Sequence, residues 1–183
     1  IFDTDENGKA TLGIDFTLND GTPQKAYVEV DTKNSTFKLK WDSLLLGYEN
    51  ERIYIKFGNV KYYLDQADLM DVLLDITSQL GLKLPSMEEL MSPETLDELM
   101  KNVQMLNVDG QTKIVFKMDG IEALIILTED MKFVNARIVL DIDGYKADLT
   151  AKQADTQDFE AFDHTYQNIR PVLDFSQPII NLI

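Results

Sequence analysis

Residues 36–41 read TFKLKW, a short run in which apolar and charged side chains alternate. Successive side chains of a β-strand point to opposite faces of a sheet, so this run predicts a strand with one apolar and one polar face. The same period of two extends toward the N-terminus, where residues 10–18 place Ala, Leu, Ile, Phe and Leu on the even positions. The alternation therefore predicts a sheet that buries one face and wets the other.

The first 65 residues predict about six strands within residues 9–65. Short turn sequences such as Asp20-Gly21 and Gly58-Asn59 separate the apolar runs. Connections of this length suit hairpins and are too short for the crossovers that parallel strands need. We therefore expect an antiparallel meander in which neighbours in sequence are neighbours in the sheet.

The period then changes to that of a helix. Residues 66–104 predict two or three amphipathic helices, with a stop at Gly81 and new starts at Ser86 and Ser92-Pro93. Their apolar stripes have the i, i+3, i+4, i+7 spacing of a helix face that packs on something else. The stripe residues are Leu69, Leu73, Ile76 and Leu80, then Met87, Leu90 and Met91, then Leu96, Leu99, Met100 and Val103.

Strand patterns return in residues 111–152, where four strands are predicted. Residues 121–127 are apolar on both faces, as in a central strand that is covered on both sides. Asp143-Gly144 marks the last hairpin turn. The remaining residues, 153–183, begin acidic and end apolar, which fits either a strap over the outer face of the sheet or a linker.

These patterns predict a mainly β (α+β) fold. The 183 residues fit a single domain, residues 1–183. About ten antiparallel strands in one sheet should curl under their own twist into an incomplete barrel. The inserted helices must bury their apolar stripes, and we expect them on the concave face.

This order of elements resembles the periplasmic lipoprotein-carrier fold of the LolA and LppX type, an incomplete antiparallel barrel closed by helices between two strand groups. The resemblance covers about residues 9–152 and rests on element order and on alternating segments such as 36–41 and 136–141. It departs from the family at the N-terminus, where a long helix usually precedes the first strand. No family residue is carried over as a functional site.

The resemblance implies a hollow that holds acyl chains. Flexible methionines on the helices would let such a hollow adapt to varied apolar guests. The expected lining is Trp41, Leu69, Leu73, Ile76, Met87, Met91, Leu96 and Met100. The same stripes can equally fill a solid core, and the chain would then be an interaction module that docks through its acidic surface or a sheet edge.

Composition excludes several functions. The net charge of −15 repels phosphate backbones, so nucleic acid is not an expected partner. The chain has no cysteine and a single histidine, His164, so neither thiolate chemistry nor a histidine-based triad or zinc site can be built. We expect no enzyme activity and no cofactor, and the partners we expect are a lipid or another apolar small molecule and an envelope protein.

The acidic start of the chain resembles the beginning of a calcium loop. Asp3, Asp5 and Asn7 stand at alternate positions before Gly8, as the first oxygen ligands of such loops do. The twelfth loop position is Ile14 instead of glutamate, and a strand pattern follows instead of a helix. A weak calcium site and a frayed acidic terminus both remain open.

The chain begins at Ile1, which is compatible with a processed form. A removed signal peptide or a lipid-bearing N-terminus upstream would place the protein outside the cytoplasm, in the cell envelope or secreted. No apolar run approaches the roughly 20 residues of a membrane span.

Overall fold

The computed structural model describes residues 2–19, 21–79 and 92–173. These residues form one open sheet of twelve strands in the order β12-β6-β5-β4-β3-β2-β1-β11-β10-β9-β8-β7. The two strand groups join where β1 pairs antiparallel with β11. The first group consists of β1 (Lys9–Leu18), β2 (Gln24–Asp31), β3 (Thr36–Trp41), β4 (Leu44–Glu49), β5 (Arg52–Phe57) and β6 (Val60–Asp65).

The second strand group continues the same sheet on the other side of β1. Its members are β7 (Val103–Val108), β8 (Gln111–Met118), β9 (Ile121–Thr128), β10 (Phe133–Ile142) and β11 (Tyr145–Gln153). The remaining elements are α1 (Gln66–Gln79), α3 (Pro93–Lys101), the short strand β12 (Gln167–Asn168) and a 3₁₀ turn, η1 (Arg170–Val172). The pair β12–β6 is parallel, and all the other neighbouring pairs are antiparallel.

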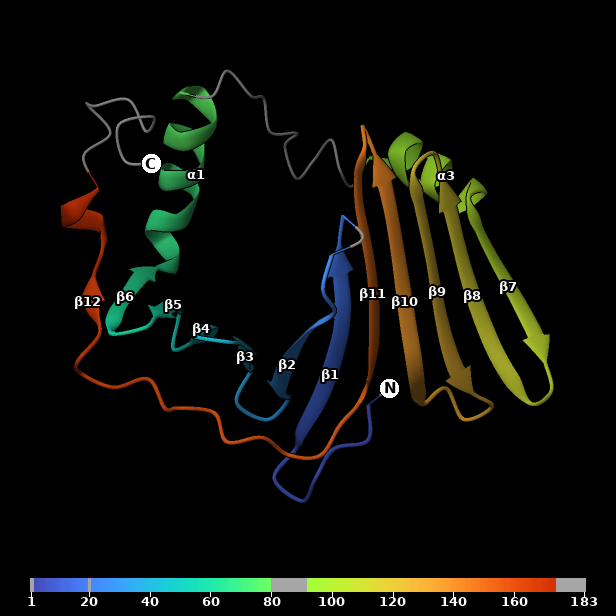
Figure 1. Cartoon of the computed structure of the whole chain (residues 1–183), viewed down its shortest axis with the longest axis horizontal. Coiled ribbons are helices and arrows are strands. Elements are labelled where there is room, and N and C mark those ends of the chain that lie inside the picture. The colour runs from blue at the N-terminus through green and yellow to red at the C-terminus, as the bar shows by residue number, and fades with distance from the viewer. Residues whose placement is uncertain (1, 20, 80–91, 174–183) are drawn as a thin grey trace.

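The sheet turns strongly along its width. In Figure 1 the strands β7–β11 are seen broadside, whereas β2–β6 are seen closer to edge-on. Within the described residues, α1 contacts chiefly β6 and α3 contacts chiefly β7, so the two helices stand near opposite ends of the sheet. Twist between neighbouring strands accumulates across a wide open sheet, which explains the turn.

The mainly β class predicted from the sequence is confirmed, but two details of that prediction are wrong. The sheet has twelve strands instead of about ten, because residues 103–108 form β7 and residues 167–168 add β12. The sequence pattern predicts helix up to residue 104, yet α3 ends at Lys101. Val103 continues the apolar spacing of the helix by coincidence while it begins a strand.

The strand β9 is also less covered than expected. Its apolar residues on both faces predicted a central, fully covered strand. In the structure Ile125 is 38% exposed and its neighbour Ile126 is half-buried. Only Leu127, near the end of the strand, is buried, at 5% exposed, so among the described residues most of this strand is not fully covered.

Candidate binding surface

One face of the sheet is apolar across both strand groups, and we call it the apolar face. The register aligns Leu39 of β3 with Val28 of β2 and Leu46 of β4, and Leu46 with Ile55 of β5. On the other side of the β1–β11 junction, Ile138 of β10 lies opposite Leu149 and Ala123. Side chains directly opposite in an antiparallel pair share a face, so these rows join into one surface.

The apolar face is largely open in the described structure. Its exposed members include Phe57 on β5 at 64% and Tyr145 on β11 at 74%, one in each strand group. Ile55 on β5 and Ile138 on β10 are each 41% exposed. Among the described residues, no large side chain is fully buried. Contiguous exposed apolar surface of this kind marks a place where something else binds.

The residues predicted to line a ligand site are only partly placed. Trp41 lies on the apolar face, where its ring packs edge-on against Phe16 with 5.5 Å between centroids. Leu69 is half-buried in the first turns of α1, and Met100 in α3 is 65% exposed. Leu73, Ile76 and Leu96 lie on these helices, but their side chains are outside the description, as are Met87 and Met91 altogether. The lining therefore remains a prediction.

The opposite, polar face carries part of the C-terminal region, for which the sequence left a strap over the outer face or a linker open. Residues 154–166, which we call the strap, leave β11 and run along the first strand group to reach β6 (Figure 1). The ring of Phe162 stacks on Tyr54 of β5 with 4.2 Å between centroids and only 3° between planes. Tyr166 closes the same cluster edge-on, 5.3 Å from the Tyr54 ring and 5.5 Å from the Phe162 ring.

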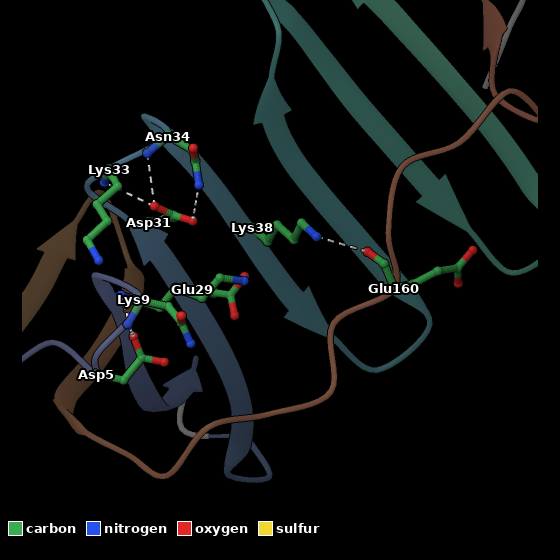
Figure 2. A network of polar contacts seen from close by, with 9 residues as sticks. Asp5, Lys9, Glu29, Asp31, Lys33, Asn34, Lys38 and Glu160 are labelled. Atoms are coloured by element: carbon green, nitrogen blue, oxygen red, sulfur yellow. Dashed lines mark hydrogen bonds and ion pairs between the residues drawn. The ribbon is translucent and has the colours of Figure 1, made fainter.

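Lysines of the polar face hold the strap by its acidic residues and its carbonyls. The ammonium groups of Lys38 and Lys40 donate to the carbonyl oxygens of Glu160 and Asp158, each at 3.3 Å. The Glu160 carboxylate bridges Lys56 and Lys61, with 2.7 Å to Lys61 Nζ. These two hydrogen-bonded ammonium groups lower the pKa of Glu160. Figure 2 shows the Lys38–Glu160 contact beside the first strands.

A hollow of about 510 Å³ opens between the strap and the strands β3–β5. Charged side chains from both walls face it, among them Lys40, Lys56, Asp158 and Glu160. Such a lining does not suit an apolar guest, which needs mostly hydrophobic walls. The hollow is thus distinct from the site that the sequence predicted beneath the helices.

The acidic N-terminal residues are engaged within the chain. Asp5 Oδ1 accepts hydrogen bonds from the backbone N–H groups of Asn7 and Lys9, both at 2.9 Å. The Lys9 bond is the main reason for the lowered pKa of Asp5. Asp3 pairs with Lys132 at 2.9 Å.

A search of the described residues finds no group of three or more acidic or histidine side chains that could hold a metal ion. The calcium site suggested for Asp3, Asp5 and Asn7 thus stays a prediction without support from neighbouring ligands.

A second polar cluster stabilises the turn after β2. The carboxylate of Asp31 accepts bonds from the backbone N–H of Lys33 and from both the backbone and the side-chain amide of Asn34, at 2.9–3.0 Å. These bonds lower the pKa of Asp31. Lys9 pairs with Glu29 on the adjacent strand, as Figure 2 shows. The cluster is explained by turn geometry and needs no ligand.

Among the described helices, none is both long and apolar enough to cross a membrane.

The solved structures to which this chain is similar include a lipoprotein and a LolA superfamily protein. The lipoprotein LppX from Mycobacterium tuberculosis aligns over 85% of this chain and 91% of its own, with 14% identity and a TM-score of 0.39. A LolA superfamily protein from Nitrosomonas europaea aligns over 81% of this chain and 86% of its own, with 8% identity and a TM-score of 0.30. No family model and no protein with a curated description matches the sequence.

The resemblance in element order predicted from the sequence is therefore found again by structural comparison. At TM-scores this low the positions of equivalent strands diverge widely, so the similarity transfers no binding site to this chain. The chain's own surface has to carry any functional conclusion.

Proposed function

We propose that this protein binds an apolar ligand, such as a lipid chain, against the apolar face of its sheet. The observation that carries the proposal is the exposure of that face across both strand groups. Covering apolar surface is worth about 25 cal/mol per Å², so a hydrocarbon chain laid along several exposed residues would gain substantial free energy. Without a bound partner, an exposed apolar face that extends over both strand groups would promote aggregation of the protein.

The helical segment is the natural cover for such a ligand. Residues 66–102 join β6 to β7, the two strands that lie near opposite ends of the sheet. A cover built there would close the sheet into the incomplete barrel expected from the sequence, with helices on its concave face. Leu69, Leu73, Ile76, Met87, Met91, Leu96 and Met100 would then face the ligand together with Trp41.

The proposed role is that of a carrier without catalytic activity. An extracytoplasmic location, in the envelope or secreted, fits a lipid ligand, and a lipid anchor upstream of Ile1 would fit it further. Residues 1–183 would act as a single domain, with residues 153–183 as a covering segment of the first strand group. A protein of the envelope would deliver or receive the ligand.

The direct test is native mass spectrometry of protein purified without detergent, followed by titration with an environment-sensitive fatty-acid probe. We expect co-purified lipid and saturable, stoichiometric probe binding. The variant Ile138→Gln, on the apolar face, should weaken probe affinity several-fold, because it places a polar amide where the hydrocarbon would lie.

The matched control is Glu122→Gln, one strand away on the opposite face, where Glu122 is exposed and pairs with Lys117. It should leave probe affinity unchanged. A bare chain with no saturable probe binding would end the carrier proposal and favour an interaction module with a filled core.

A further inference from the structure

The strand β7 is a free edge of the sheet. It stands last in the strand order, and within the described residues no strand pairs with its outer side. Its exposed side chains include Met105 at 63%, Leu106 at 47% and Val108 at 41%. Proteins usually protect such an edge with charges, prolines or bulges, because unpaired backbone groups recruit further strands. The six residues of β7, VQMLNV, include none of the protective types.

Backbone groups on the outer side of β7 can be assigned from its hairpin. Asp109 and Gly110, with φ of 51° and 71°, form a two-residue turn, so Val108 and Gln111 close the hairpin as a hydrogen-bonded pair. The bonded pairs then recur at every second residue toward the start of the strand. The bond from the N–H of Lys117 to the carbonyl of Asn102, 3.0 Å long, fits this phase. The N–H and C=O groups of residues 103, 105 and 107 therefore point outward.

Charge at the two ends of the strand favours one kind of partner. Lys101 closes α3 just before β7, and Asp109 opens the turn just after it, and both are exposed. A second copy of the strand laid antiparallel brings each Lys101 end to the partner's Asp109 end. A parallel copy would instead set like charges together. The strand between is uncharged, so it is a place where two molecules of net charge −15 can approach.

We propose that β7 pairs with β7 of a second copy of this chain, in antiparallel orientation about a two-fold axis at Met105. This register pairs Met105 with Met105 and Val103 with Asn107, and so uses all three outward-facing residues of each copy. Paired residues then share a face, so the apolar faces of the two sheets run together. The contact is isologous, as in most soluble dimers.

The absence of cysteine from the chain allows a position-specific test. In a hydrogen-bonded antiparallel pair the two Cα atoms are about 5.5 Å apart, within the range of a disulfide. The variant Met105→Cys should form a covalent dimer under mild oxidation, seen on a non-reducing gel. The control Met118→Cys lies on the same face of the next strand and is 45% exposed. It should remain monomeric on the gel.

Sedimentation velocity over a range of concentrations tests the same contact without a covalent bond. The unmodified chain should show a concentration-dependent dimer. The variant Met105→Pro removes an outward N–H and should abolish the dimer, and its circular dichroism should remain that of the unmodified chain, because proline is tolerated where an edge strand faces solvent.

A charge variant distinguishes pairing at the β7 edge from non-specific association of the molecules. Lys101→Glu places like charges together twice in the dimer and should weaken association about tenfold at low salt. Asp109→Asn in that background should restore part of the loss. Lys152→Glu makes the same change of net charge on β11, away from the edge, and should have a much smaller effect.

Three results would overturn the proposal. One is a chain that stays monomeric at all concentrations with no cross-link at position 105. Another is a dimer that survives Met105→Pro in a folded protein. The third is equal cross-linking at positions 105 and 118, which would indicate stacking of the faces instead of pairing of the edges. Lipid binding can fail or succeed independently of each result.

Discussion

The hydroxyl of Tyr166 is buried without a hydrogen-bond partner among the described residues. The residue is only 5% exposed, at the point where the strap meets β6. Burial is the main cause that raises its pKa to about 12, because it disfavours the charged phenolate. The ring of Tyr166, in contrast, makes several contacts. It packs against the rings of Tyr54 and Phe162, and Lys61 Nζ lies 5.3 Å from its centroid.

Removing the hydroxyl should therefore not destabilise the protein. For Tyr166→Phe we expect an unfolding free energy that is unchanged or higher by up to about 1 kcal/mol, since an unpaired buried polar group is lost and the ring is kept. Tyr166→Ala should lower the unfolding free energy by about 3 kcal/mol, because the aromatic contacts are lost. Urea unfolding measures both. A clear loss of stability in Tyr166→Phe would mean that the hydroxyl has a partner.

At the scale of elements, the strap packs against the sheet at Gly47, where the missing side chain leaves room for the ring of Phe162. A Cβ built on this residue would overlap the ring of Phe162 and approach the carbonyl oxygen of Phe37 to 2.9 Å. Gly47→Ala should then displace Phe162 and cost about 1–3 kcal/mol in unfolding free energy, as overpacking does. In a Phe162→Ala background the same change should cost less, because only the carbonyl contact remains.

A double-mutant cycle measured by urea unfolding tests this coupling. The two positions lie on β4 and on the strap, so a coupling energy above about 0.5 kcal/mol would show that the strap packs on the sheet in solution. Additive effects would contradict the packing of Phe162 over Gly47.

Acid should weaken the hold on the strap. Because Lys56 and Lys61 lower the pKa of Glu160 in the folded chain, the carboxylate stabilises the fold at pH values above about 4.5, the ordinary glutamate value. That contribution is lost as the pH falls through the lowered pKa. A hydrogen bond from the Thr165 side chain likewise lowers the pKa of Asp163, so this carboxylate also stabilises the fold near neutral pH and loses that contribution in acid.

Hydrogen exchange followed by mass spectrometry should show this loss locally. On lowering the pH from 7 to below 4, residues 154–166 should lose protection before β9 and β10 do, after correction for the intrinsic exchange rate. Glu160→Gln should already show a loosened strap at pH 7 and a smaller further change in acid. Uniform loss of protection along the chain would speak against a locally held strap.

The elements that the sequence predicted well are those with a clear period. Alternation along residues 36–41 predicts the strand β3 at its observed bounds, and the predicted turns Gly58-Asn59 and Asp143-Gly144 lie where β5 meets β6 and β10 meets β11. The strand β7 was not predicted, because an edge strand with apolar residues on both faces shows no alternation. The contacts of the strap could not be predicted, for a different reason. Glu160 meets Lys56 at 104 positions' distance in sequence, and no local pattern encodes such a pairing.

At the scale of the whole molecule, the same limit applies to the candidate site. Period-two alternation predicts that an apolar face exists, since it depends only on neighbouring residues. How far that face is covered depends on where the helices and the strap lie. The strap lies on the polar face, where Lys38 and Lys40 hold it, so the strap does not cover the apolar face. Sequence alone left a strap over the outer face and a linker as alternatives, because the contacts that distinguish them join residues far apart in the chain.

An exposed apolar face and a net charge of −15 act against each other, and their balance should depend on salt. At neutral pH and low ionic strength, charge repulsion opposes contact between the apolar faces of two molecules. In about 1 M sodium chloride the Debye length falls to about 3 Å, and face-to-face association should then appear in light scattering. Near pH 4.3, the isoelectric point, it should appear without salt. Measured in the Met105→Pro background to exclude edge pairing, Ile55→Gln and Ile138→Gln together should reduce the salt-induced scattering. If scattering stays flat up to this salt concentration, the apolar face is covered in solution.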